Sequence, residues 1–266
     1  MANVVYLFCL TRLGGLGSFA GTMAEGLGPV AICPYRDIAA VVSEVSLATL
    51  GGENDGTAEA SARTLRQAMG HEAVVEGVMR TAGVLPTRLG TVFSSWDALE
   101  QVLRTAYATI LSFLEKAGAA EEWAVKVYWD RTKGTEALWA ETSARQEAYL
   151  TALPPGKRYL EEQRLRKGLG REASRKMQQY GREIEECLEG VTADCRRREL
   201  QSSPAGEGRA MLLNLACWVP KENGQRFRDC LETVKGAWGK GALIVEDSGP
   251  WPPYSFAPCL ETEGPA

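Results

Sequence analysis

The feature that most constrains this chain is a long helical pattern in its second half. Apolar and small side chains recur there at spacings of three and four residues, which is the period of one face of an α-helix. The other faces mix Lys, Arg and Glu. The predicted helix must therefore project from the body or pack in a hairpin against Thr135–Leu153, which precedes a break at Pro154-Pro155-Gly156. The side chains of the apolar face are Leu169, Ala173, Met177, Tyr180, Ile184, Cys187, Val191 and Cys195.

The segments around this helix predict the rest of the second half. Glu122–Trp129 alternates side chains with a period of two, as a strand with one buried face does. The whole order is strand, helix, strand, strand, helix, strand. This order is typical of a ferredoxin-like domain, here modified by an extended helical region over about residues 135–198. The later segments are a short strand at Glu199–Ser203, a turn at Pro204–Gly208, a strand at Arg209–Val219, a helix at Lys221–Trp238 and a strand at Ala242–Glu246.

The first half predicts a separate mixture of strands and helices. Asn3–Leu10 is rich in β-branched and aromatic residues, as a buried strand is. Helical spacing follows between Thr57 and Ala82, where apolar residues recur every three or four positions at Leu65, Ala68, Met69, Val75, Val78, Met79 and Ala82. Other predicted elements are strands at Val30–Cys33, Ile38–Val45 and Val84–Phe93, and a helix that begins at Ser95 and ends near Ala117-Gly118.

The fold class expected from these segments is α+β. Ala117–Ala120 is the weak point between the two halves. We therefore expect an N-terminal α+β domain at residues 1–118 and a C-terminal ferredoxin-like domain at residues 119–266.

Composition and charge exclude several classes of protein. The 266 residues are 45% hydrophobic and 24% charged, which is ordinary for a globular protein. Lys and Arg number 30 against 34 Asp and Glu, and the net charge of −4 argues against a general polyanion binder. No apolar stretch approaches the ~20 residues of a membrane span. A secretory signal would carry a Lys or Arg before its apolar run, and none precedes Val4–Leu10. We expect a cytoplasmic protein without nucleic-acid or membrane partners.

The cysteines and the single histidine limit the chemistry. Seven cysteines, none in a Cys-x-x-Cys pair, predict reduced and mostly buried thiols. Cys187 and Cys195 lie too far apart along the predicted helix to share one metal, and one histidine cannot build a zinc site with two or three His ligands. His71 lies within a predicted helix, and no nucleophile motif accompanies it. We expect no catalytic residue, no metal and no cofactor.

A Gly-rich loop carries the sharpest enzyme-like motif. Gly15–Ala20 has the G-x-G-x-x-A spacing of dinucleotide-binding loops, follows a predicted strand and precedes Asp37 by about twenty residues. A dinucleotide site needs this loop to open a helix, whereas Gly21, Gly26, Gly28 and Pro29 interrupt one almost at once. An ordinary loop is expected. A small-molecule or nucleotide-binding α+β protein that uses Gly15–Ala20 is the alternative function.

Two other segments have both a structural and a functional interpretation. Arg196-Arg197-Arg198 is a basic run at a predicted helix end, where cations suit the helix dipole. The aromatic and Pro-rich tail at residues 249–256 contains Trp251, Tyr254 and Phe256. Such a tail covers the edge of its own core or offers an apolar surface to a partner.

Five segments together carry a resemblance to a known family. They are His71-Glu72 within a helix, Val84–Phe93 (VLPTRLGTVF), Lys126–Trp129, Gly156–Leu160 (GKRYL) and the closing tail Gly249–Phe256. In these segments, and over nearly its full length, the chain resembles the gas vesicle accessory proteins of the GvpF/GvpL family.

The resemblance implies a role that is not enzymatic. Members of this family are minor components of gas vesicles, the hollow protein shells that make cells buoyant. They are thought to engage the hydrophobic shell subunit GvpA during nucleation or assembly and to keep it from aggregating. The resemblance also implies an N-terminal α+β domain joined to a modified ferredoxin-like domain, and partners that comprise GvpA and other gas vesicle accessory proteins.

A protein that binds a hydrophobic subunit in water needs an apolar patch on an otherwise charged surface. The long helix and the aromatic tail are the two candidate surfaces. A regulatory ferredoxin-like module with another protein partner is a third possible function. The candidate partner-binding residues are Met177, Tyr180, Ile184, Val191, Trp251, Tyr254 and Phe256.

Overall fold

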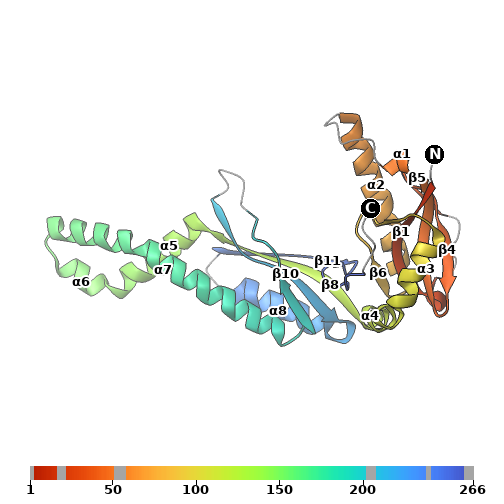
Figure 1. Ribbon diagram of the computed structural model, residues 1–266. Helices are drawn as coiled ribbons and strands as arrows, with labels where there is room; N and C mark the ends of the chain where they lie inside the picture. The colour runs from red at the N-terminus through yellow and green to blue at the C-terminus, as the bar shows by residue number, and fades with distance from the viewer. Residues whose placement is uncertain (1–2, 17–21, 51–57, 202–207, 238–240, 261–266) are drawn as a thin grey trace. The chain divides into compact units, whose positions relative to one another are not determined.

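The computed structural model describes residues 3–16, 22–50, 58–201, 208–237 and 241–260 (Figure 1). Contacts divide the chain into two compact units. Unit 1 is Met1–Glu122 with Pro250–Ala266, and unit 2 is Trp123–Gly249. The expected division lay at residue 118 and placed the aromatic tail in the second domain. The contacts instead group the tail with unit 1, because Tyr254 and Ser255 hydrogen-bond to carboxylates of that unit.

Unit 1 is built on an antiparallel sheet with the strand order β4-β5-β1-β6, in which β7 also pairs with β1. The central strand β1 is buried from Val4 to Thr11, because it has neighbours on both edges and core on its faces. A short hairpin of β2 (Met23–Ala24) and β3 (Gly28–Pro29) lies in a second, two-stranded sheet. The strands of the larger sheet are β1 (Asn3–Arg12), β4 (Ala31–Tyr35), β5 (Ile38–Ser46), β6 (Val84–Pro86) and β7 (Val92–Phe93).

Helix α2 (Ala58–Met79) packs on β1 and β6 through His71 and a run of valines, and its Gly70 lies against the β2–β3 hairpin. Gly70 leaves no room for a Cβ, because the backbone of Glu25 lies against it. Not every residue of the predicted apolar spacing lies on the packed face, since Leu65 and Met69 are 61% and 57% exposed. The remaining helical elements of unit 1 are η1 (Leu13–Gly15), α1 (Leu47–Leu50), α3 (Trp96–Thr105) and α4 (Tyr107–Ala119).

The helix predicted from Ser95 is two helices in the structure. Ser95 caps α3 by accepting a hydrogen bond from the backbone N–H of Ala98, as its position suggests. Ala106 then departs from helical geometry, with φ −93° and ψ 6°, and α4 begins at Tyr107. The apolar spacing continues across the break, so periodicity alone does not reveal it.

Unit 2 contains a sheet with the strand order β11-β8-β10-β9. Its elements follow the predicted series of strand, helices, strand, strand, helix, strand. The second strand is β9, and it comes earlier in the chain than the predicted Glu199–Ser203. The basic run therefore lies largely in β9 rather than at a helix end, because α7 ends at Glu189. The strands are β8 (Ala120–Asp130), β9 (Asp194–Arg197), β10 (Arg209–Pro220) and β11 (Leu243–Trp251).

Three helices between β8 and β9 form a hairpin that reaches beyond the sheet of unit 2 (Figure 1). They are α5 (Arg131–Arg145), α6 (Glu147–Ala152) and α7 (Pro155–Glu189). Helix α7 contacts α5 and α6 of the hairpin, and it also contacts β9, β10 and α8 of the sheet layer. After β10, η2 (Lys221–Asn223) and α8 (Gly224–Ala237) complete the unit.

The apolar core of unit 2 lies between the sheet, α7 and α8. Ile184 and Leu188 of α7 and Phe227 of α8 are almost wholly buried in it. Cys187 and Cys230 form a disulfide between the two helices, which contradicts the expectation that every cysteine is a reduced thiol. Sequence spacing does not reveal this pair, because its partners are 43 residues apart and only the packing of α8 on α7 brings them together.

None of the helices that the structure describes combines the length and the apolar character needed to cross a lipid bilayer.

Candidate functional site

A groove in unit 2 is the candidate binding site. It has a volume of about 680 Å³ and runs between the C-terminal half of α7, strand β10 and the segment that follows β9. Its apolar lining comes from Met177 on α7, from Leu200 and from β10. Leu200 is 54% exposed, although it borders buried apolar groups. The lining residues are Ser174, Met177, Gln178, Gly181, Arg182, Glu185, Arg197, Arg198, Leu200, Met211, Leu212, Leu213 and Asn214.

Backbone and side-chain hydrogen bonds hold the wall of the groove after β9. The Arg198 N–H donates to the Asn214 carbonyl at 2.7 Å, and the Asn214 side-chain amide donates to the Glu199 carbonyl at 2.8 Å. Asn214 is 5% exposed, and within the described ranges its Oδ1 has no hydrogen-bond partner. These hydrogen bonds join the segment after β9 to β10, so they hold this wall of the groove in place.

Charged side chains border the groove on two sides. Arg197 makes a bidentate ion pair with Glu185, with N–O distances of 2.5 and 2.6 Å, which joins β9 to α7. This hydrogen bonding raises the pKa of Arg197, so that guanidinium stays charged. The groove therefore combines an apolar floor with a charged border, an arrangement that suits an apolar protein segment in water.

Burial differs among the candidate residues that the sequence assigned to the long helix, of which Val191 in fact follows α7 because that helix ends at Glu189. Met177 lines the groove and is partly buried. Tyr180 is partly buried and lies against Trp129, with the ring centroids 6.1 Å apart. Ile184 and Val191 are core residues with 0% and 9% exposure. These two side chains belong to the core between the sheet and α8, so they are not available to a partner in this structure.

The candidate residues of the tail also differ in how far their side chains are exposed. Trp251, at the end of β11, is 42% exposed, whereas Phe256 is buried with 9% exposure. Tyr254 is half-buried and donates its hydroxyl hydrogen to Glu72 at 2.9 Å. Burial first, and the Glu72 carboxylate next, raise the pKa of Tyr254, while burial raises the pKa of Glu72.

A second carboxylate anchors the tail beside Tyr254. Glu122 is 1% exposed, and its two oxygens accept hydrogen bonds from the backbone N–H and the hydroxyl of Ser255 at 2.9 and 2.8 Å. Pro252 and Pro253 are buried next to them. The tail therefore covers the core of unit 1, which is the first of the two interpretations that its sequence allows.

His71 belongs to a buried hydrogen-bond network rather than to a catalytic site. Its Nε2 lies 3.1 Å from the Thr87 carbonyl oxygen, which can only accept, so Nε2 carries the hydrogen. Nδ1 then accepts from the Tyr6 hydroxyl at 2.8 Å. Burial lowers the pKa of His71 to about 4 and raises that of Tyr6 to about 12. The Thr87 hydroxyl donates to backbone carbonyls of β1, so this network joins three elements of unit 1.

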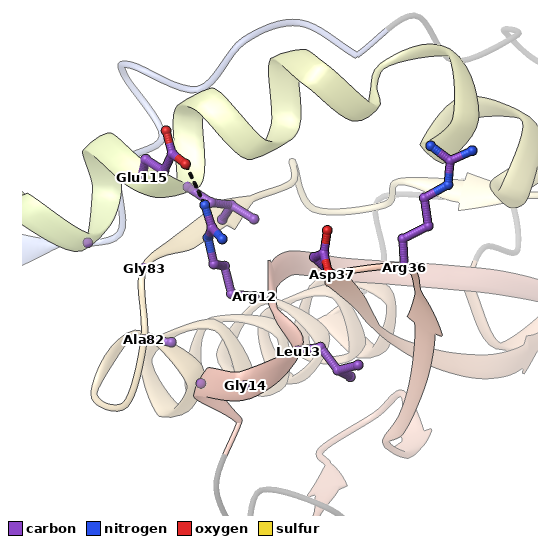
Figure 2. A pocket seen from close by; sticks show the side chains of 11 residues that line it. Arg12, Leu13, Gly14, Arg36, Asp37, Ala82, Gly83 and Glu115 are labelled. Carbon is purple, nitrogen blue, oxygen red and sulfur yellow. Dashed lines mark hydrogen bonds and ion pairs between the residues drawn. The ribbon is translucent and has the colours of Figure 1, made fainter.

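The Gly-rich loop borders a pocket of about 820 Å³ in unit 1 (Figure 2). Arg12 forms an ion pair with Glu115 at 2.6 Å, and Arg36 points away from this pair and lies over the rings of Tyr35 and Tyr107. Both arginines therefore already interact with side chains of unit 1, Arg12 through an ion pair and Arg36 through cation–π contacts. Figure 2 labels Arg12, Leu13, Gly14, Arg36, Asp37, Ala82, Gly83 and Glu115 among the lining residues.

The described part of this loop does not match a dinucleotide site. Gly17–Ala20 lie outside the described residues. Strand β1 leads into the 3₁₀ turn η1, and Met23 already begins strand β2. A dinucleotide fold instead joins its first strand to a helix whose N-terminus binds the pyrophosphate.

Among the described residues, no group of three or more His, Cys, Asp or Glu side chains could hold a metal ion.

Sequence reasoning missed four apolar residues of the groove. Leu200 and Met211 flank the predicted turn at Pro204–Gly208, and Leu212 and Leu213 lie within the predicted strand Arg209–Val219. The signal that could have identified Leu200 is an isolated leucine between charged and polar residues, but such leucines are common on surfaces.

The comparisons with known proteins agree with one another. A family model described as gas vesicle synthesis protein GvpL/GvpF matches residues 4–258. Gas vesicle protein L of Streptomyces sp. (strain CB03234) is 27% identical over 97% of this chain and 94% of its own length. Gas vesicle protein L1 of Halobacterium salinarum is 23% identical over 97% of this chain and 92% of its own length.

Two crystal structures share the fold. GvpF from Anabaena sp. PCC7120 is similar with a TM-score of 0.65 and 18% identity, over 99% of this chain and 100% of that one. GvpF from Microcystis aeruginosa is similar with a TM-score of 0.63 and 17% identity, over 96% and 99% of the two chains. The mixed α+β architecture with antiparallel sheets is thus the architecture of GvpF. The chain belongs to the gas vesicle GvpL/GvpF family, which is a family of gas vesicle proteins and not a known enzyme family.

Proposed function

We propose that this chain is an accessory protein of gas vesicle assembly that binds the hydrophobic shell subunit GvpA and keeps it from aggregating before it joins the shell. A subunit that will face gas exposes apolar surface in water, and such surface aggregates unless a companion covers it. This role includes nucleation of the shell, residence in the cytoplasm at the vesicle, and contact with other gas vesicle accessory proteins.

The observation that supports this role is the groove of unit 2. It offers Met177, Leu200 and Met211 to a ligand, and arginines and Glu185 surround it. We also interpret unit 2 as a modified ferredoxin-like domain, because its strand order β11-β8-β10-β9 places the first and third strands in the centre.

The burial of the side chains changes the set of candidate binding residues. Met177 is kept, and Leu200 and Met211 are added because they line the groove. Ile184 and Val191 are excluded, because replacing either by a polar residue would disrupt the core instead of testing binding. Deleting residues 252–256 has the same defect, because it removes buried groups of unit 1.

The test is co-expression of GvpA with the tagged chain, in which the soluble and co-purified fractions of GvpA are measured. The groove variant is Met177→Gln with Leu200→Gln. The matched control is Leu65→Gln with Met69→Gln, which removes one leucine and one methionine from an exposed face of α2. We expect the groove variant to lose GvpA and the control to retain it, with circular dichroism unchanged in both. Equal retention by the two variants, or equal loss, would contradict binding in the groove.

A further inference from the structure

The outward face of α7 carries a row of cations. Lys157, Arg164, Lys167, Arg171 and Arg175 follow one another at spacings of seven, three, four and four residues. At 100° per residue they fall within an arc of about 80°, and they cover about 27 Å of helix. All five side chains are exposed. We call this set the basic stripe.

The basic stripe contains no acidic residue. Leu160 is the other residue of α7 between Lys157 and Arg175 that falls in the same arc, and it is 68% exposed. The opposite side of the helix carries Leu165, Leu169 and Ala173, and Leu169 is buried. The stripe thus faces away from the side of α7 that packs in the hairpin.

Few carboxylates compensate these charges. Pro155–Lys176 contains eight Lys and Arg against three Glu, an excess of five positive charges in a chain with a net charge of −4. Within the described ranges, Arg164 alone of the five has a carboxylate within 4.0 Å, that of Glu161 at 3.7 Å. By contrast, Arg158 and Lys176, which lie off the stripe, form close ion pairs with Glu162 and Glu141.

This arrangement does not serve the stability of the hairpin. Like charges three and four residues apart repel each other along a helix, and cations near the N-terminal end oppose the helix dipole. An exposed helix face is more stable with mixed charges, as on the other faces of α7. A stripe that costs stability and packs against nothing described in its own unit suits a partner of opposite charge.

We propose that the basic stripe is a docking surface for an acidic helix of another protein, one that presents glutamates or aspartates along one face. From Arg164 to Arg175 the cations recur about once per helical turn, every ~5.4 Å, which is the repeat that a second α-helix aligned with α7 presents. Exposed Leu160, within the same arc, supplies an apolar contact near one end of the stripe. A second copy of α7 in the same register cannot be the partner, because the two stripes would repel each other.

Two other classes of partner fit less well. An anionic membrane surface is bound by helices that insert apolar side chains, and Leu160 is the single apolar residue in the arc between Lys157 and Arg175. Single-stranded nucleic acid is bound by cations interleaved with aromatic rings, and no aromatic residue lies in that arc. The stripe lies N-terminal to the groove along α7, so this proposal stands independently of GvpA binding.

The test uses the full chain and a fluorescent 22-residue peptide designed as a helix with glutamates at spacings of three and four on one face. Fluorescence polarisation measures its binding at low and at high salt. A scrambled peptide of the same composition, with glutamates on all sides, is the control ligand. A single-stranded 22-nucleotide DNA is the competing ligand class.

The stripe variant combines Lys167→Glu, Arg171→Glu and Arg175→Glu. Its matched control combines Arg66→Glu, Arg80→Glu and Arg88→Glu, which reverses three exposed cations of unit 1 and changes the net charge equally. We expect wild type and control to bind the helical peptide, and the stripe variant to bind it roughly tenfold or more weakly, with binding weakened by salt. Equal affinities of the two variants, equal binding of the scrambled peptide, no binding by wild type, or preference for the DNA would each overturn the proposal.

Discussion

The Tyr6 hydroxyl donates a hydrogen bond to Nδ1 of His71 across 2.8 Å, and the Gly90 N–H in turn donates to the Tyr6 oxygen at 3.2 Å. His71 Nε2 donates to the Thr87 carbonyl, so the imidazole is neutral and both of its nitrogens are satisfied. The single histidine of the chain thereby connects α2 to β1 and to the segment that follows β6. Its role in this structure is to hold these elements together.

This network predicts a loss of stability in mild acid. Burial lowers the pKa of His71 from 6.5 to about 4, so below pH 6.5 the unfolded chain binds a proton that the folded chain does not. The stabilisation is fully present above pH 6.5 and is lost as the pH falls toward 4. The loss attributable to His71 is on the order of 2–3 kcal/mol. Urea unfolding at several pH values measures this loss. In the His71→Gln variant, the free energy of unfolding should fall less steeply between pH 6.5 and 4. An identical slope in the variant would assign the effect to other groups.

The anchoring of the tail predicts a modest cost for removing one hydroxyl. Tyr254→Phe leaves the half-buried Glu72 carboxylate without this donor, and we expect unfolding to become easier by about 1–2 kcal/mol. Tyr149→Phe, on an exposed tyrosine of α6, is the matched control and should change stability little. The measurement is chemical denaturation followed by circular dichroism. Equal stability of the two variants would show that the Tyr254 bond to Glu72 contributes nothing.

Two helix glycines should respond in opposite directions to alanine. A Cβ at Gly134 would overlap the ring of Trp129, so Gly134→Ala should destabilise unit 2 by about 1–3 kcal/mol and alter tryptophan fluorescence. At Gly168 on α7 an added methyl group would meet no atom within 4 Å, and Gly168→Ala should stabilise the helix by about 0.5–1 kcal/mol. Thermal unfolding measures both. Similar shifts in the two variants would contradict the close approach of Gly134 to Trp129.

The disulfide between Cys187 and Cys230 predicts a thiol count. In denaturant without reductant, five cysteines should react with a thiol reagent, namely Cys9, Cys33, Cys195, Cys217 and Cys259. After reduction all seven should react. Cys187→Ser should release Cys230, so all six remaining cysteines of that variant should react without reductant. Seven reactive thiols in the unreduced wild type would show that the pair is reduced.

Local patterns were enough to predict many elements of this chain. The period of two in Glu122–Trp129 identified β8, and the apolar spacing from Leu169 onward identified α7. Ser95 was correctly placed at the start of a helix. Each of these signals depends on neighbouring residues, which the sequence displays directly. The family resemblance, based on motifs such as VLPTRLGTVF, was also confirmed.

Other expectations were wrong where distant parts of the chain decide the outcome. Leu65 and Met69 have helical spacing but face outward, because Gly70 lets α2 approach the backbone of Glu25 on its other face. The short strand β9 lies at Asp194–Arg197, since its partner residues on β10 fix its position. The basic stripe is not apparent in the linear sequence, because Glu161, Glu162 and Glu172 on neighbouring faces of α7 stand between its cations.

The sequence by itself determined the order of elements, the long helix and the family, because periodicity, capping and motifs are local. Only the tertiary structure decided which apolar residues are surface and which are core. Met177 and Ile184 lie on the same predicted face, yet one lines a groove and the other is buried in the core with β10 and α8. The physical reason is that burial depends on what packs over a side chain, and those residues come from segments far away in the chain.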